Sequence, residues 1–174
     1  LPPGPPGELR LGGGTILRGY LDNPEATREN ITSDGWLRTG DLAEITEDGA
    51  IVFHGRLKDS LRLRGFLVDP AEIEECLLAL PGVEAAQVVG ATPPDGRGEV
   101  AVAFVRAEPG AEPDPERLRA ECRGRMAAYK VPERVIVLDA FPTVDGPNGS
   151  KVRRVELRRM AADALAASGQ EAAC

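Results

Sequence analysis

The stretch GRLKDSLRLRG, residues 55–65, divides this chain into two parts with different sequence patterns. Residues 1–59 contain short apolar alternations separated by Gly and Asp, which is typical of strands and turns. After Asp59 the apolar spacing changes, and helical segments alternate irregularly with strands. Residues 60–174 have the usual size of one domain, whereas 59 residues are few for an independent core. We therefore predict domains at 1–59 and 60–174 in an α+β fold, with a short sheet flanked by helices in the second.

The patterns also place the individual elements. Strands are predicted at 8–11, 16–20, 42–45 and 50–54, and Asn23 is predicted to cap a short helical turn that begins at Pro24. In the second part, a half-buried strand at 61–65 precedes a helix at 70–80, whose apolar face carries Ile73, Leu77 and Leu80. Further strands are predicted at 83–89, 99–107 and 134–138, and further helices at 115–127 and 155–167.

Composition narrows the class of protein. The chain is 42% hydrophobic and 28% charged, as expected of a globular protein. Its formal net charge of −7 argues against binding to nucleic acid. No stretch has the pattern of a signal peptide or the length of a membrane span, so we expect a cytoplasmic protein. The three cysteines are widely spaced without a CxxC pair, which predicts neither a disulfide framework nor a metal site.

Three side chains have chemistry suited to a nucleotide. Asp41, in Thr39-Gly40-Asp41, is predicted to lie on a tight turn, where its carboxylate can accept both hydroxyls of a ribose. Arg56 ends a predicted strand, where its guanidinium can bind ribose or phosphate oxygens. Lys151 follows Gly146-Pro147-Asn148-Gly149 on a predicted loop, and its amine can offset charge on a phosphate and an attacking carboxylate. The alternatives are an ordinary Gly-Asp turn and a surface arginine at a sheet edge.

Three segments in this order resemble the carboxyl-terminal portion of the adenylate-forming (AMP-binding) ligases: GWLRTGDLAEITEDG at 35–49, GRLKDSLRLRG at 55–65 and PNGSKVRRVELR at 147–158. This superfamily includes acyl- and aryl-CoA synthetases, peptide-synthetase adenylation domains and luciferases. The resemblance extends from Gly7 to about Leu157. It implies that residues 1–59 are a remnant of the last subdomain of the large adenylation domain, and that residues 60–174 are the mobile C-terminal lid domain.

The resemblance implies a role for each matching residue in the nucleotide site. Asp41 would bind the ribose of ATP, and Arg56 would contact ATP. Lys151 would be the catalytic lysine of the adenylation step only. Ser150 separates Lys151 from Gly149, whereas many family members place the lysine directly after glycine.

The same resemblance implies a hinge and a second site. Lys58 and Asp59 would form the hinge, with Asp59 as the pivot of the lid. Gly65 would lie on the path of the CoA pantetheine. Arg62 and Arg64 would meet the anionic end of CoA, although a solvated basic face is an equal interpretation of these two side chains.

The implied function is that of an ATP-dependent acyl-CoA synthetase, which forms an acyl-adenylate and then, after lid rotation, a thioester with CoA. ATP, CoA and Mg²⁺ are implied, with no Mg²⁺ ligand in this chain. The implied partners are a missing large N-terminal adenylation domain and a small carboxylic acid, with a preference for fatty acids. The isolated chain is expected to be inactive. The alternatives are a fragment of a peptide-synthetase adenylation domain and a non-catalytic binding module with the lid fold.

Overall fold

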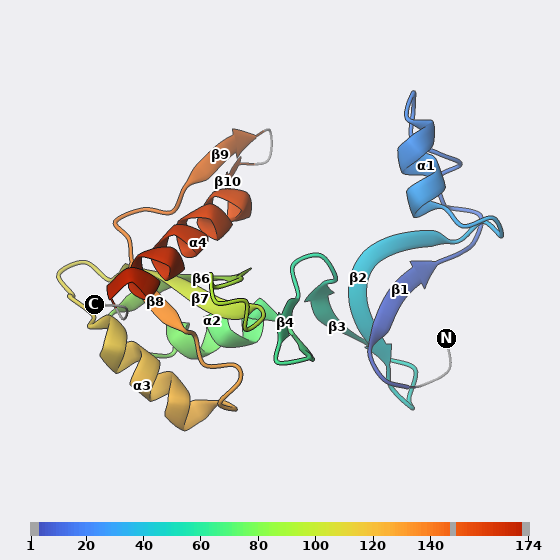
Figure 1. Cartoon of the computed structure of the whole chain (residues 1–174). Coiled ribbons are helices and arrows are strands. Elements are labelled where there is room, and N and C mark those ends of the chain that lie inside the picture. Colours follow the sequence, from blue (N-terminus) through green and yellow to red (C-terminus); the bar gives the residue numbers. More distant parts are fainter. Residues whose placement is uncertain (1–3, 147–148, 172–174) are drawn as a thin grey trace. The chain divides into compact units, whose positions relative to one another are not determined.

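The computed structural model describes residues 4–146 and 149–171, and the α+β fold class is confirmed (Figure 1). The chain forms two compact units, Leu1–Asp59 and Ser60–Cys174. Their assignment to a remnant subdomain and a lid stays a prediction.

The first unit is built on a three-stranded antiparallel sheet. Its strands are β1 (Gly7–Leu11), β2 (Leu37–Ile45) and β3 (Ile51–Arg56), in the order β1-β2-β3. Helix α1 (Pro24–Asn30) begins as predicted, because the Asn23 side chain accepts a hydrogen bond from the Ala26 N–H. The strand predicted at 16–20 is absent and the segment is irregular with bends, since the glycines before and within it favour bends over a ladder.

This unit has few buried side chains. Among its described residues, the buried hydrophobic ones are Leu42 and Ala43. Large apolar side chains are exposed on it instead: Leu11, Leu17, Tyr20, Leu21, Trp36, Ile51, Val52 and Phe53. Apolar burial is the main favourable term in folding, so this sheet gains little stability from its own core.

The second unit has a three-stranded sheet with helices on both faces (Figure 1). Strand β6 (Val83–Ala91) is antiparallel to β7 (Val100–Ala107), and β7 is parallel to β8 (Arg134–Val137). Helices α2 (Pro70–Leu78) and α3 (Pro115–Arg125) pack on one face. Helix α4 (Arg154–Glu171) packs on the other.

The central strand β7 shows why the sheet is covered twice. Successive side chains of a strand point to opposite faces. Ala103 and Val105 join the core under α2 and α3, whereas Val102 and Phe104 join the core under α4. The predicted apolar face of α2 is confirmed, with Ile73, Leu77 and Leu80 all buried.

Two hairpins complete the second unit. Strands β4 (Leu61–Leu63) and β5 (Phe66–Val68) pair across the two-residue turn Arg64-Gly65. Leu61 and Leu63 are buried while Arg62 is exposed, which confirms the half-buried strand. Strands β9 (Thr143–Gly146) and β10 (Gly149–Val152) form the second hairpin.

The loop predicted for Lys151 is therefore corrected. Lys151 lies on strand β10, where it pairs with Val144 of β9. The β-branched residues Thr143, Val144 and Val152 favour this strand pairing over an open loop. Pro147 and Asn148, which belong to the predicted loop, lie outside the described residues.

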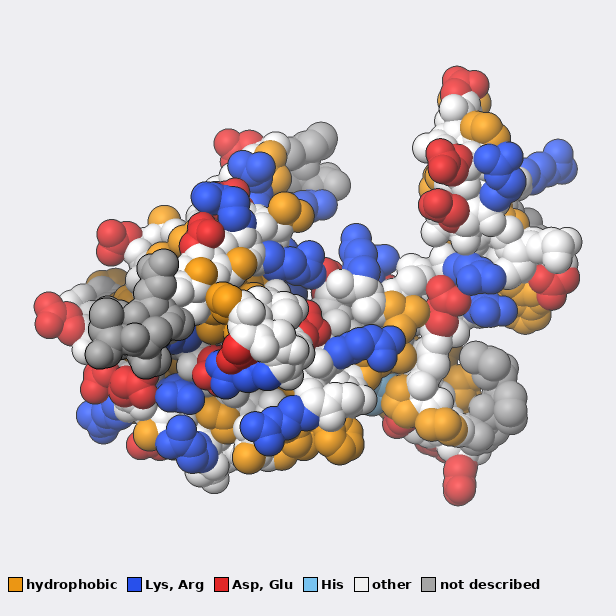
Figure 2. All heavy atoms as spheres, in the orientation of Figure 1, with side chains coloured by type: hydrophobic (Ala, Val, Ile, Leu, Met, Phe, Trp, Pro, Cys, Tyr) orange, Lys and Arg blue, Asp and Glu red, His pale blue; other side chains and the backbone are white. Residues whose placement is uncertain are grey.

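Charged side chains of both signs are interspersed on the visible face of the second unit (Figure 2). Within residues 4–146 and 149–171, no helix has both the length and the apolar character needed to cross a membrane.

Candidate functional site

Asp41 lies within strand β2, not on the turn predicted for it. It pairs with Arg56 of β3, and Arg56 Nε lies 2.8 Å from Asp41 Oδ1. The Asp41 side chain is 21% exposed. It is therefore held by a neighbouring guanidinium while part of its carboxylate still faces solvent.

The backbone around Asp41 is fixed by Thr39. The Thr39 hydroxyl donates to the Leu9 carbonyl at 2.8 Å and accepts from the Asp41 N–H at 3.0 Å. Arg56 Nη1 also donates to the Thr39 carbonyl at 3.2 Å. The three strands thus hold one acid and one base in a defined pair. The sequence analysis named Thr39 only as part of the Thr39-Gly40-Asp41 motif, and the sequence carries no signal for these contacts.

The predicted hinge residues follow this pair directly. After β3 ends at Arg56, the Leu57 N–H donates to the Gly40 carbonyl at 2.9 Å, and the Asp59 N–H donates to the Arg56 carbonyl at 3.0 Å. Lys58 is exposed in this turn. The boundary between the two units falls immediately after Asp59.

The turn of the β4–β5 hairpin contains the predicted pantetheine residues. Arg64 has φ 50° and Gly65 has φ 88°, so both occupy left-handed backbone conformations. Two-residue hairpins favour such turns because they match the twist of the strands, and Asn-Gly is the usual sequence. The Cβ of an arginine is sterically unfavourable in this conformation, whereas glycine has no Cβ. Arg62, Arg64 and Gly65 are all exposed.

A cavity of about 260 Å³ lies beside this turn. Its lining includes Arg64 from the turn, Arg97 and Glu99 from the segment before β7, and Tyr129 and Glu133 from the segment before β8. Tyr129 stacks on Phe66 of β5, with ring centroids 4.6 Å apart. The hairpin therefore packs against the segment before β8 through an aromatic pair.

Lys151 is exposed on β10, and the base of its hairpin is anchored. The Arg153 N–H donates to the Pro142 carbonyl at 2.8 Å. Arg154, the first residue of α4, donates from Nη2 to Glu74 Oε1 of α2 at 3.0 Å. The same Glu74 oxygen accepts from the Val88 N–H of β6 at 2.8 Å.

Burial raises the pKa of Glu74, while the Val88 N–H and the Arg154 charge act in the opposite direction. Its side chain is only 13% exposed. Glu74 joins α2, β6 and the start of α4, so it supports the segment that presents Lys151. Sequence reasoning missed this role, although the helical spacing in Pro70–Leu78 places Glu74 beside the buried Ile73.

The predicted site residues therefore form three groups. Asp41 and Arg56 pair in the first unit, next to Lys58 and Asp59. In the second unit, Arg62, Arg64 and Gly65 share one hairpin, while Lys151 lies on another. No group of three or more His, Cys, Asp or Glu residues in the described part of the chain is arranged to hold a metal ion.

Comparison with known proteins identifies a family and relatives for this chain. Residues 72–145 match the family model of the AMP-binding enzyme C-terminal domain. Feruloyl-CoA synthase of Amycolatopsis sp is 41% identical over 160 residues, which cover 91% of this chain and 31% of that protein. 4-Coumarate–CoA ligase 1 of Oryza sativa subsp. japonica is 38% identical over 154 residues, covering 88% of this chain and 27% of that protein.

Solved structures include a protein with the same fold over most of this chain. The crystal structure of ATP-bound MatB from Rhodopseudomonas palustris has a TM-score of 0.82 and 34% identity, covering 95% of this chain and 32% of that one. This chain thus spans less than a third of the length of each of these three proteins.

Proposed function

Because this chain belongs to the adenylate-forming (AMP-binding) ligase superfamily, as a carboxyl-terminal portion, we propose that it serves an ATP-dependent acyl-CoA synthetase. The observation that carries the proposal is that two segments with predicted roles lie on separate hairpins of one unit. Lys151 is on the β9–β10 hairpin and Gly65 is on the β4–β5 hairpin. A unit that presents different hairpins can serve two successive steps.

In the first step, the Asp41 carboxylate binds the ribose of ATP. Arg56 holds Oδ1 of this carboxylate, and the exposed part accepts the ribose hydroxyls. Arg56 contacts ATP in the same step, because a guanidinium can donate to ribose or phosphate oxygens. ATP brings Mg²⁺ with its phosphates, and we assign no residue of this chain to that ion.

Lys151 acts in the same step. Attack of a carboxylate on the α-phosphate concentrates negative charge on both groups, and the Lys151 ammonium offsets it. The bond to the α-phosphate forms as the bond to pyrophosphate breaks, which gives acyl-adenylate and pyrophosphate. A hairpin anchored through Arg153 and Arg154 presents the ammonium from a fixed base.

In the second step, the second unit rotates at Lys58 and Asp59, and the Gly65 turn replaces Lys151. The CoA thiol then attacks the acyl carbonyl, and AMP leaves. Gly65 has no Cβ, so pantetheine can pass close to its backbone. Arg62 and Arg64 are exposed beside it, where they can bind the phosphates of CoA.

We further propose that a large N-terminal domain supplies the rest of the site. Two observations support this partner: the chain spans less than a third of its relatives, and its first unit exposes most of its large apolar side chains. The isolated chain is then inactive. A small carboxylic acid is the proposed substrate, and the preference for fatty acids and the cytoplasmic location stay predictions.

A hybrid enzyme tests the proposal without knowledge of the natural acid. In it, this chain replaces the matching carboxyl-terminal part of the Amycolatopsis feruloyl-CoA synthase. We expect the hybrid enzyme to form feruloyl-CoA from ATP and CoA, and the shortened relative alone to form none. A folded hybrid without activity would contradict the proposal and favour a non-catalytic binding module.

A further inference from the structure

Glu99 connects the β4–β5 hairpin to the central sheet. It lies just before β7, and its Oε2 accepts a hydrogen bond from the Arg62 N–H of β4 at 2.5 Å. A strand in a two-stranded hairpin has an open edge, whose amides need partners outside the ladder. Glu99 supplies that partner with a charged acceptor, and hydrogen bonds to charged groups are the stronger ones.

Gly90 provides the space for this side chain. It lies on β6, paired with Ala101 of β7. A Cβ at Gly90 would overlap the Glu99 carboxylate. The backbone of Gly90 does not require a left-handed conformation, so the absence of a side chain serves the space and not the turn. Gly90 and Glu99 thus form a matched pair, in which the missing side chain of Gly90 leaves the space that the Glu99 carboxylate occupies.

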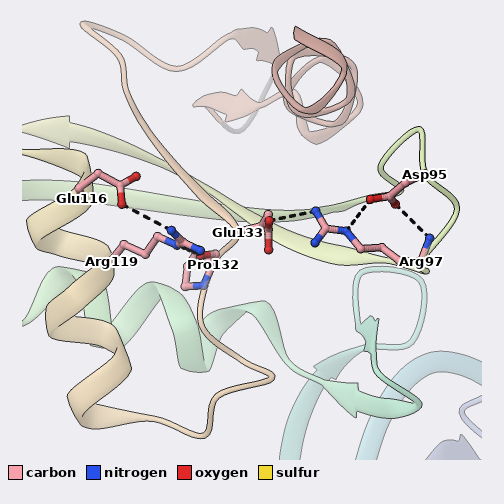
Figure 3. A network of polar contacts seen from close by, with 6 residues as sticks. All are labelled: Asp95, Arg97, Glu116, Arg119, Pro132 and Glu133. Atoms are coloured by element: carbon pink, nitrogen blue, oxygen red, sulfur yellow. Dashed lines mark hydrogen bonds and ion pairs between the residues drawn. The ribbon is translucent and has the colours of Figure 1, made fainter. Parts of the chain in front are cut away.

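The segment that leads into Glu99 is itself fixed (Figure 3). Arg97 Nη2 donates to Glu133 Oε1 at 3.0 Å, and Arg97 Nε lies 3.1 Å from Asp95 Oδ2. The Arg97 N–H also donates to Asp95 Oδ1 at 3.1 Å. The Glu133 N–H donates to the Ala101 carbonyl at 2.8 Å. Glu99 therefore extends from a braced loop toward the hairpin.

From these contacts we propose that Glu99 is a positioning residue for CoA, which acts by holding the β4–β5 hairpin in place. Gly90 leaves the space that the Glu99 carboxylate occupies. The proposal rests on the function proposed above, in which this hairpin carries Gly65 past pantetheine. Glu99 holds Arg62 two residues before Arg64, and Glu99 and Arg64 line the same cavity. Loss of the Glu99 contact lets the turn shift, and a shift of about 1 Å in a working group can cost on the order of 100-fold in rate.

The first test measures the contact itself in the 174-residue chain. Amide hydrogen exchange of Arg62 is followed by NMR in the wild type and in four variants: Glu99→Ala, Glu99→Gln, Gly90→Ala and the double variant Gly90→Ala/Glu99→Ala. We expect exchange at Arg62 to be about 10-fold faster in Glu99→Ala. Glu99→Gln keeps an acceptor and should remain near the wild type. Gly90→Ala should match Glu99→Ala, because it displaces the carboxylate.

Matched controls separate this effect from general destabilisation. An added Cβ at Gly124 of α3 would meet no described atom within 4 Å beyond its chain neighbours and its own helix backbone, so Gly124→Ala controls for Gly90→Ala. Glu108 is exposed at the other end of β7, so Glu108→Ala controls for Glu99→Ala. Neither control should alter exchange at Arg62. The double variant should exchange no faster than either single variant, and additive effects would overturn the matched pair.

The second test measures catalysis in the hybrid enzyme. Glu99→Ala and Gly90→Ala should lower kcat/KM for CoA by about 10- to 100-fold, mainly through KM, with adenylation unchanged. Glu99→Gln should restore most of it. Faster exchange at Arg62 with unaltered CoA kinetics would overturn the positioning role, and so would equal losses in both steps. If the unmodified hybrid is inactive, the proposed function and the role of Glu99 in positioning CoA are both contradicted. The exchange data at Arg62 still test the contact between Glu99 and Arg62.

Discussion

Arg64 occupies a left-handed backbone conformation that is unfavourable for arginine. Its φ of 50° costs an arginine about 1 kcal/mol that an asparagine largely avoids. We expect Arg64→Asn to leave thermal stability unchanged or higher and to raise KM for CoA in the hybrid enzyme, because the turn improves while a cation is lost. Differential scanning fluorimetry and CoA kinetics measure the two effects. A rise in stability with unaltered KM would assign Arg64 to the solvated surface.

Asp41 gives a second prediction at this scale. Asp41→Asn removes the charge that faces Arg56 and weakens acceptance of the ribose hydroxyls. A hydrogen bond to a charged group contributes roughly 1.5–3 kcal/mol, so we expect KM for ATP to rise by about 10- to 100-fold, with a smaller change in kcat. The control is Glu47→Gln, an exposed acid on the β2–β3 turn. Equal effects of the two variants would contradict a specific role for Asp41.

The identity of these site residues could be predicted from the sequence, but their contacts could not. Asp41 and Arg56 are fifteen residues apart, and their pairing depends on the register of β2 and β3. Glu99 was not predicted as a site residue, because its contact with Arg62 spans 37 positions. The space at Gly90 also exists only after β6 and β7 pair. Long-range contacts of this kind leave no local pattern.

Among the elements, α2 is joined to β6 and α4 by a partly buried carboxylate. Burial raises the pKa of Glu74 above its ordinary value near 4.5. The folded chain therefore binds this proton more tightly than the unfolded chain does. The resulting stabilisation is complete below the unfolded pKa and is lost as pH rises through the raised, folded pKa.

The Glu74→Gln variant tests this sign. The free energy of unfolding of the wild type, minus that of Glu74→Gln, should be larger near pH 4.5 than at pH 7. The reason is that glutamate can bind a proton at position 74, whereas glutamine cannot. Urea unfolding at a series of pH values measures the difference. A difference that is flat or grows toward pH 7 would contradict burial as the dominant influence on Glu74.

Elements with clear apolar patterns or capping residues were predictable, and three short strands were not. The helix at α2 was placed from its first-turn proline and its apolar face. The β5, β9 and β10 strands were missed because three or four residues carry too little alternation to separate a strand from a loop. That error moved Lys151 from a strand to a predicted loop.

For the whole molecule, the two units differ in their cores. The second has apolar clusters on both faces of its sheet, and the first has two buried hydrophobic residues among those described. We expect amides of β6 and β7 to exchange far more slowly than those of β1 and β3 in the isolated chain. Hydrogen exchange with mass spectrometry measures this. Comparable protection in both sheets would mean that the first unit is stable without a large domain.

The half-reactions of the hybrid enzyme test the central claim most directly, namely that Lys151 serves adenylation and the Gly65 hairpin serves thioester formation. In Lys151→Ala, we expect adenylate formation to fall by about 100- to 1,000-fold, while preformed adenylate still reacts with CoA at the wild-type rate. Arg153→Ala, altered at an exposed neighbour, is the control. Equal losses in both half-reactions, or unaltered adenylation, would contradict the assignment of the two steps to two hairpins.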